Sequence, residues 1–258
     1  MSKIAEFKSV QNPKANEFIR LADQIIIGKS KEAQLALICL ISGGHLLIED
    51  LPGMGKTTFV MLLAKLAGLD LKRIQFTNDL LPADILGTHI YDPKTSQFNF
   101  QPGPIFSEVV LGDELNRATP KTQSAFLQAM EEHKVTIDGK TYPLPEPFFL
   151  IATQNPIQQV GTFPLPESQL DRFMMRLRMS FPDRASEKKM LLESHSRPQV
   201  ESLTAVLDKR TLMSWRAASL EIFVSELLVE YVQDILAASR TNLKLQGGLS
   251  PRTGLLLL

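Results

Sequence analysis

The stretch Leu46-Leu47-Ile48-Glu49-Asp50-Leu51-Pro52-Gly53-Met54-Gly55-Lys56-Thr57-Thr58 decides the fold. Its apolar start is typical of a buried strand, its middle is a glycine loop, and the residues that follow, 56–67, have the composition of a helix. In a phosphate-binding loop of this form, backbone N–H groups close around phosphate oxygens. Lys56 would then reach the β and γ phosphates, and Thr57 would bind Mg²⁺. The stretch therefore predicts a nucleoside triphosphate site, with Asp50 in place of the first glycine of the strict pattern; the alternative is an ordinary glycine turn before a helix.

Short apolar runs outside this stretch are rich in β-branched and aromatic residues, as buried strands are. They lie at residues 74–76, 109–111, 148–152 and 176–179. Helical patterns separate several of them, and the helix expected at 31–41 is apolar on nearly every side. Strands that alternate with helices favour an α/β core in which helices flank a parallel sheet.

Two segments between these elements have the pattern of β-hairpins. Asp138-Gly139 separates strand-like runs at 135–137 and 140–142, and this dipeptide accepts the positive φ angles of a type I′ turn. A looser version of the pattern spans residues 90–100. Between the hairpins, Thr119 can cap a helix whose first turn suits Pro120. We therefore expect hairpin insertions near 90–100 and 135–142.

The chain changes character after residue 182, where strand patterns give way to helical ones. In the clearest segment, apolar residues recur at steps of three and four and form one stripe: Val224, Leu227, Leu228, Tyr231, Val232, Ile235 and Leu236. The sequence predicts a nucleotide-binding core over residues 1–182 and a helical appendage over 183–258. Because four leucines end the chain at 255–258, soon after the turn-like Ser250-Pro251, we expect this appendage to be incomplete.

Composition limits the range of partners and locations. The 258 residues fit one large domain, or a core with a smaller appendage. The 28 Lys and Arg residues balance 28 Asp and Glu residues, whereas a dedicated nucleic-acid-binding protein usually carries a basic excess. The most apolar region, 35–48, is interrupted and too short for a membrane span, and a single cysteine, Cys39, suits a reducing compartment. We expect a soluble, cytoplasmic protein without membrane insertion and without nucleic acid as its main partner.

Two adjacent carboxylates follow the strand-like run 109–111. In phosphate-loop ATPases the first acid of such a pair holds Mg²⁺ and a following Glu can polarise the attacking water, which assigns Asp113 and Glu114 to these tasks. Asn155 ends the strand-like region 148–153, where its amide could align that water with the γ-phosphate. The plainer alternatives are solvated acids at a strand end and a turn at Asn-Pro.

Several motifs taken together resemble the MoxR family of AAA+ ATPases. They occur in order within residues 26–252 and read Leu111-Gly112-Asp113-Glu114-Leu115-Asn116-Arg117-Ala118, Lys121-Thr122-Gln123-Ser124, Ala129-Met130-Glu131-Glu132, Ile151-Ala152-Thr153-Gln154-Asn155-Pro156 and Gln169-Leu170-Asp171-Arg172-Phe173. The resemblance implies an AAA+ core with a five-stranded parallel sheet and a C-terminal helical lid. It also makes the two hairpins the insertions of the helix-2-insert group. In such proteins Asp50 is an accepted variant at the start of the loop.

The resemblance also implies a role for each site residue. Asp113 corresponds to the Walker B metal anchor, Glu114 to the catalytic base and Asn155 to sensor 1. Arg172 resembles the arginine finger that reaches ATP bound to a neighbouring subunit, and Arg252 resembles the sensor 2 arginine of the lid. The nucleotide-binding residues implied are Ile27, Gly28, Asp50, Leu51, Pro52, Gly53, Met54, Gly55, Lys56, Thr57, Thr58 and Asp113, of which Thr57 and Asp113 would bind Mg²⁺. The family often has Gln after that Ile-Gly pair, where this chain has Lys29.

The function implied is ATP hydrolysis at the subunit interfaces of a ring, expected to be hexameric. Such a machine would remodel or mature a protein client, with a von Willebrand factor A domain in the partner. Phe98 and Phe100 of the first hairpin either grip that client or pack against the body. Arg172 alternatively forms a salt bridge with Asp171 or another nearby acid. Two rival functions are a nucleotide-gated binding module with little turnover and a magnesium-chelatase-like or helicase-like motor on the same core.

Overall fold

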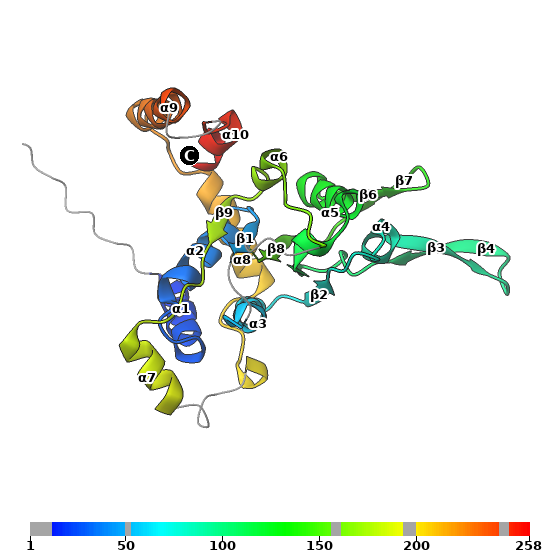
Figure 1. The fold of residues 1–258 in the computed structure, drawn as a ribbon, viewed down its shortest axis with the longest axis horizontal. Helices are drawn as coiled ribbons and strands as arrows, with labels where there is room; N and C mark the ends of the chain where they lie inside the picture. Colours follow the sequence, from blue (N-terminus) through cyan, green and yellow to red (C-terminus); the bar gives the residue numbers. More distant parts are fainter. Residues whose placement is uncertain (1–11, 50–52, 156–160, 193–199, 243–247) are drawn as a thin grey trace, which may run out of the picture.

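The computed structural model describes residues 12–49, 53–155, 161–192, 200–242 and 248–258 (Figure 1). A five-stranded parallel sheet lies at its centre, with the strand order β2-β5-β8-β1-β9. Its strands are β1 (Leu46–Glu49), β2 (Leu71–Gln75), β5 (Val109–Asp113), β8 (Phe149–Gln154) and β9 (Met175–Leu177). Each apolar run of the sequence overlaps one of these strands, which confirms the predicted α/β core.

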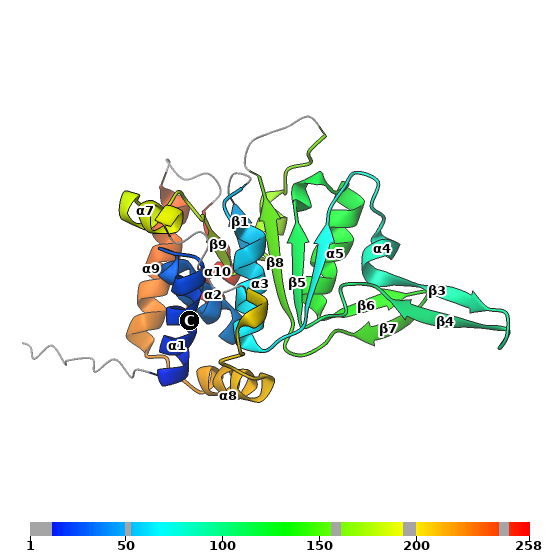
Figure 2. The ribbon, with the colours of Figure 1, turned by 90° about the horizontal axis from the view of Figure 1, so that it is seen from below.

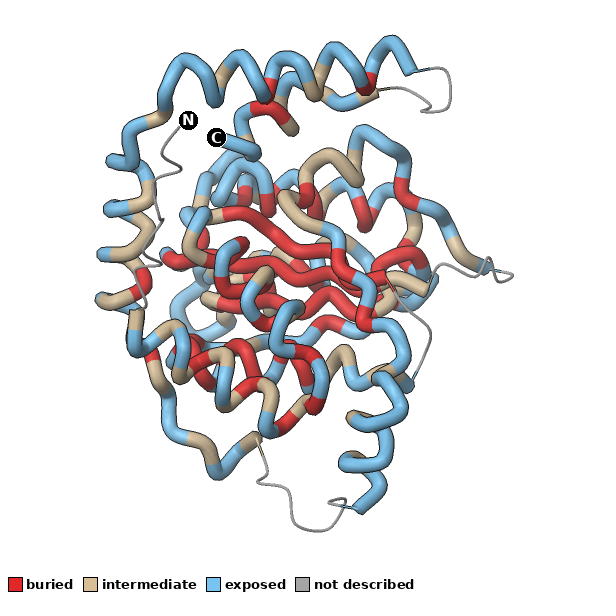
Figure 3. The backbone as a smooth tube through the Cα atoms, turned by 90° about the vertical axis from the view of Figure 1, so that its left-hand side faces the viewer, coloured by how far each residue is buried: buried red, intermediate tan, exposed pale blue. Residues whose placement is uncertain are grey.

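Helices cover both faces of this sheet (Figure 2). Successive residues of a strand point to opposite faces. Accordingly, Leu46 and Ile48 of β1 belong to one core cluster, whereas Leu47 belongs to the other. Figure 3 shows the buried residues concentrated in the central sheet. The helices are α1 (Pro13–Ile25), α2 (Ser30–Ile41) and α3 (Lys56–Ala67) on the first face, and α4 (Pro82–Leu86) and α5 (Pro120–Glu132) on the second.

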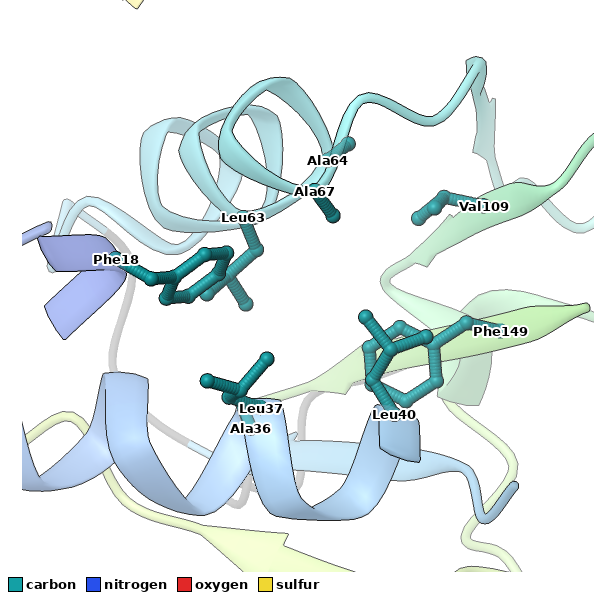
Figure 4. Close-up of a pocket in the computed structure, with 9 residues that line it drawn as sticks. All are labelled: Phe18, Ala36, Leu37, Leu40, Leu63, Ala64, Ala67, Val109 and Phe149. Carbon is teal, nitrogen blue, oxygen red and sulfur yellow. The ribbon is translucent and has the colours of Figure 1, made fainter. Parts of the chain in front are cut away.

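A small gap lies in the first core cluster, between the helices α1, α2 and α3 and the strands β5 and β8 (Figure 4). Its free volume is about 10 Å³, and the side chains around it are apolar: Phe18, Ala36, Leu37, Leu40, Leu63, Ala64, Ala67, Val109 and Phe149. Even a single buried water needs roughly this volume and also polar partners. The gap is therefore a packing defect and not a ligand site.

Both predicted hairpins are present and contact each other. They consist of β3 (Gly87–Asp92) with β4 (Gln97–Pro102), and of β6 (Lys134–Ile137) with β7 (Lys140–Pro143). Asp138 and Gly139 have φ angles of 50° and 77°, as the predicted type I′ turn requires. The ring of Phe100 stacks on Tyr142 with 4.0 Å between centroids, whereas Phe98 is 69% exposed. Of the two aromatics considered as client contacts, Phe100 thus packs within the molecule and Phe98 stays accessible.

The helices after the sheet differ in how closely they pack. They are α7 (Arg184–Leu192), α8 (Lys209–Leu220), α9 (Glu226–Thr241) and α10 (Pro251–Leu256). α8 packs on the core through Leu212, which belongs to the first core cluster. The helix predicted around 224–236 is present as α9, but Val232 is the one buried residue of its apolar stripe. The division into residues 1–182 and 183–258 stays a prediction. Across the described ranges, no helix is both long and apolar enough to cross a membrane.

His45, just before β1, is a buried histidine whose two ring nitrogens are both used. Nδ1 accepts a hydrogen bond from the N–H of Leu150 at 3.1 Å, so the proton lies on Nε2, which donates to the carbonyl of Met130 at 3.2 Å. Burial, together with the neighbouring His133, lowers the pKa of His45 to about 3. The imidazole is therefore neutral in the folded protein at any pH near neutrality.

This neutral histidine makes stability depend on pH. In the unfolded chain His45 has its ordinary pKa of about 6.5 and gains a proton as the pH falls, whereas in the folded protein it does not. The free energy of unfolding should therefore fall by about 2 kcal/mol between pH 7 and pH 5 through this residue alone. Urea unfolding at the two pH values, on the natural protein and on His45→Gln, measures this difference. An equal pH dependence in both proteins would contradict it.

Candidate functional site

The glycine loop between β1 and α3 has a backbone that requires glycine. Gly53 and Gly55 have φ angles of 86° and 75°, in the left-handed region that residues with a side chain rarely adopt. A Cβ atom at either position would meet nothing within 4 Å, so conformation and not crowding explains both glycines. α3 begins at Lys56, and the N–H groups of a first helical turn attract anions. Three predicted site residues lie outside the described residues: Asp50, Leu51 and Pro52.

The parallel sheet brings the other predicted residues to this loop. β5, β8 and β1 are adjacent, so their carboxyl ends meet at one edge of the sheet. A cleft of about 450 Å³ lies there, a size that suits a small-molecule ligand. The cleft is lined by Gly53, Met54, Gly55, Lys56, Thr57, Thr58, Asp113, Glu114, Thr153, Gln154 and Asn155. The described part of the loop, both acids and Asn155 therefore surround one cavity.

Asp113 is a buried carboxylate held by two side chains. It accepts a hydrogen bond from the hydroxyl of Thr153 at 2.6 Å and another from Nη2 of Arg73 at 2.7 Å. The same hydroxyl oxygen of Thr153 accepts the backbone N–H of Glu114 at 2.9 Å. Thr153 therefore joins the carboxyl ends of β5 and β8 and fixes the position of both acidic residues.

Glu114 has a left-handed backbone, with φ of 57°, and lines the cleft. Its Oε2 atom accepts a hydrogen bond from Nε2 of Gln75 at 3.0 Å and lies 3.2 Å from Nη1 of Arg117. The Glu114 side chain is 39% exposed. A carboxylate that is anchored through one oxygen and open to solvent can receive a proton from a water in the cleft.

Sequence reasoning missed the side chains that hold the two acids, namely Arg73, Gln75, Arg117 and Thr153. Arg73 and Gln75 are two residues apart on β2, which places them on one face of the sheet. Polar residues at alternate positions of a strand were the available signal for these two. Thr153 lies inside a motif quoted for the family resemblance, but only the register of β8 against β5 shows its role.

A second cleft, of about 430 Å³, shares Gly53, Met54, Gly55 and Thr58 with the first. Its remaining wall is largely apolar and includes Ile27, which the family resemblance implies to lie beside the base of the nucleotide. Gly28 fixes the chain next to it, because its N–H donates to the carboxylate of Asp23 at 3.0 Å and a Cβ atom there would lie 2.8 Å from the hydroxyl oxygen of Ser186. An apolar cleft continuous with a phosphate loop is suited to the flat base of a nucleotide.

Arg172 and Arg252 lie together on a different part of the molecule. Nη1 of Arg172 is 3.1 Å from Oε2 of Glu131, and Nη1 of Arg252 is 2.7 Å from Oε1 of the same residue. The salt bridge considered for Arg172 therefore exists, with Glu131 and not with Asp171. Within the described residues, neither arginine lines either of the two clefts. The structure brings these arginines to each other and not to the phosphate loop.

The residues of the first cleft fit a nucleoside triphosphate with Mg²⁺. Mg²⁺ prefers oxygen ligands and is usually held by one or two protein oxygens together with phosphates and water. The hydroxyl of Thr57 and the carboxylate of Asp113 supply such oxygens at this cleft, and Lys56 supplies positive charge for phosphates.

A glycine loop at the carboxyl edge of a parallel sheet, with two acids on a nearby strand end, defines the phosphate-loop class of nucleotide-binding proteins. Residues 45–175, just over half of the chain, match the family described as ATPase family associated with various cellular activities (AAA). Together with the relatives that follow, this match shows that the chain belongs to the MoxR family of AAA+ ATPases.

Similar proteins span most of this chain. The uncharacterized protein YeaC of Bacillus subtilis (strain 168) is 44% identical over 248 residues, which cover 96% of this chain and 77% of YeaC. The chaperone MoxR1 of Mycobacterium tuberculosis is 39% identical over 218 residues, which cover 84% of this chain and 57% of MoxR1. The crystal structure of a presumed ATPase from Cytophaga hutchinsonii has a TM-score of 0.82 and 37% identity, covering 94% of this chain and 76% of that one. The fold is thus shared over nearly the whole chain.

Thr153 gives a direct test of how the cleft is held. In Thr153→Val the shape of the side chain is kept, but Asp113 loses a donor and the N–H of Glu114 loses its acceptor. Removing a hydrogen-bond partner from each of these two groups should lower the free energy of unfolding by about 1 to 3 kcal/mol. Thr136→Val, which removes an exposed hydroxyl of the second hairpin, is the control and should change it by about 0.5 kcal/mol or less. Equal losses in denaturant titrations of the two variants would contradict the role of Thr153.

Proposed function

We propose that this chain hydrolyses ATP with Mg²⁺ at the cleft between the glycine loop and the carboxyl ends of β5 and β8. The observation that carries the proposal is the convergence of Lys56, Thr57, Asp113, Glu114 and Asn155 on that single cleft. A phosphate loop alone could serve binding without turnover. Hydrolysis also needs a carboxylate that binds the metal and a second one that accepts the proton of water, and Asp113 and Glu114 supply this adjacent pair.

Each residue has one task in this proposal. The N–H groups at the start of α3 and Lys56 bind the phosphates, while Thr57 and Asp113 hold Mg²⁺, whose charge stabilises the phosphoryl group during transfer. Glu114 takes the proton from the attacking water, while Gln75 and Arg117 hold its Oε2 atom in place at the cleft. Asn155 orients that water. The adjoining apolar cleft beside Ile27 takes the adenine.

Arg172 supplies the last charge in this proposal, and it comes from a neighbouring subunit. The placement of Arg172 on Glu131, away from its own cleft, supports this arrangement. A cation directed at the transferred phosphoryl group contributes roughly 10³ to 10⁵ in rate. ATP hydrolysis would therefore require an oligomer, which we propose to be a hexameric ring.

The work done by this ATPase is proposed to be remodelling or maturation of a protein client in the cytoplasm, with a von Willebrand factor A domain in the partner. The name of the relative MoxR1, a chaperone, supports a protein client. The balance of 28 basic and 28 acidic residues favours it over a helicase-like motor. In this proposal the C-terminal helices and the hairpins move when the bound nucleotide changes, and these movements change the conformation of the client.

Glu114→Gln should separate binding from hydrolysis. The amide keeps the size of the side chain but cannot accept a proton, so we expect ATP binding within about threefold of the natural protein and turnover at least about 100-fold slower. Fluorescent-nucleotide titration and phosphate release measure the two quantities. Turnover close to that of the natural protein would remove Glu114 as the base, and a natural protein that binds ATP without turnover would favour the binding module.

A mixture of two inactive variants should recover activity if the site is shared. Lys56→Ala lacks its own phosphate site but keeps Arg172, whereas Arg172→Ala keeps the phosphate site, so each can supply what the other lacks. We expect each variant alone to be at least about 100-fold slower than the natural protein, and the mixture to regain roughly a tenth or more of its activity. The specific activity of the natural protein should also rise with protein concentration as oligomers form. Full turnover by a monomer would refute the shared site.

A further inference from the structure

Glu131, near the end of α5, is bound by two arginines at once. Its Oε2 atom pairs with Arg172, which follows α6 (Glu167–Leu170) in the core, and its Oε1 atom pairs with Arg252 of α10. Residues 131 and 252 are 121 positions apart in the sequence. A single carboxylate therefore fixes the distance between an arginine of the core and an arginine of the C-terminal helices.

A second contact beside it ties the same two segments together. The carboxylate of Asp171 accepts hydrogen bonds from the hydroxyl of Ser250 at 2.9 Å and from that of Thr253 at 3.2 Å. Ser250 is the N-cap of α10, since its hydroxyl oxygen also accepts the N–H of Thr253. The beginning of α10 is thus attached to the core twice. Asp171 binds it directly, and Glu131 binds Arg252 of α10 together with Arg172.

The geometry suits a positioning role more than a blocking one. Each guanidinium contacts Glu131 through one nitrogen, Nη1, and the side chains of Arg172 and Arg252 remain 28% and 39% exposed. An arginine has five N–H donors in a planar fork, so a phosphate can bind on the exposed side without displacing the carboxylate.

We propose that Glu131 is a positioning residue that delivers Arg172 and Arg252 together, as one unit, to the nucleotide of the neighbouring subunit. This inference rests on the proposed intersubunit ATPase. Glu131 itself touches neither substrate nor metal; it holds the two guanidinium groups side by side so that α10 and the Arg172 segment move together. Closing of the C-terminal helices would then be coupled to completion of the neighbour's site.

The test is Glu131→Gln, with Glu132→Gln as its matched control. Each arginine binds a different oxygen of Glu131, and glutamine replaces one of these oxygens by an NH₂ donor and removes the negative charge, so the present contacts with both arginines cannot be kept. Glu132 is the next residue of α5 and accepts a hydrogen bond from Gln128. Because these contacts are half-exposed, both variants should fold with melting temperatures within about 3 °C of the natural protein. We expect kcat to fall about 10- to 100-fold in Glu131→Gln with KM for ATP within about threefold, and neither to change appreciably in Glu132→Gln.

Mixing experiments identify on which side of the interface Glu131 acts. Lys56→Ala supplies intact arginines and should restore activity to Glu131→Gln, because the phosphate site of Glu131→Gln is complete. Arg172→Ala lacks the arginine and should not restore it. An unchanged or raised kcat in Glu131→Gln would overturn the inference, as would a loss that Lys56→Ala cannot restore although it restores Arg172→Ala.

One further readout separates this inference from the proposed function. In nucleotide-free protein, hydrogen exchange of the α10 amides should be about threefold or more faster in Glu131→Gln than in Glu132→Gln, because the charged contact between Arg252 of α10 and residue 131 of the core is weakened. Equal exchange rates would overturn the coupling of α10 to Arg172. If Lys56→Ala and Arg172→Ala fail to complement each other, the shared site itself fails, and Glu131 then has no neighbouring nucleotide to serve.

Discussion

The pairing of β5 with β8 is the constraint on which the nucleotide cleft depends. In their parallel register Gly112 lies beside Ala152, so the residues that follow, Asp113 and Thr153, come within hydrogen-bonding distance at the carboxyl edge. A slip of one residue would turn Thr153 to the opposite face and leave the buried carboxylate without that donor. Gly112 makes room for the ring of Phe126 against the sheet, since a Cβ atom there would lie 2.8 Å from that ring. The positions of both acids are therefore consequences of strand pairing.

The rest of the molecule makes that edge rigid. The sheet is buried on both faces, because helices pack against each face and form one core cluster there. Interiors packed in this way change shape little, so the glycine loop and the acids keep a fixed spacing. Movement is left to the elements at the periphery. Of these, the first hairpin exposes Phe98, and α9 is largely exposed.

The two arginines are the reason why we propose a site shared between two subunits. Arg172 and Arg252 share the carboxylate of Glu131 and lie outside the cleft that their own chain builds. Lys56 is the cationic side chain among the described residues that line that cleft, and a further cation would stabilise the charge of a transferred phosphoryl group. If these arginines act on the nucleotide of a neighbouring subunit, as proposed, turnover requires two subunits and therefore depends on assembly.

The local features of this protein were determined by its sequence alone. The glycine loop with Lys56, the apolar runs that form the parallel sheet and the turn at Asp138-Gly139 all follow from short-range preferences: positive φ angles, buried β-branched residues and turn chemistry. The order of motifs was specific enough to indicate the MoxR family, which the relatives confirm. These predictions succeeded because each depends on residues that are close together in the chain.

Tertiary structure alone decided the contacts between distant segments. That Thr153 joins both acids, that Arg73 holds Asp113, and that Glu131 is shared by two arginines depends on strand register and helix placement, which bring together residues from about 40 to 121 positions apart. Likewise, the apolar stripe of α9 is visible in the sequence, but its exposure is not, because burial depends on which other element packs against it. A pattern shows which face of a helix is apolar, and only the folded chain shows what covers that face.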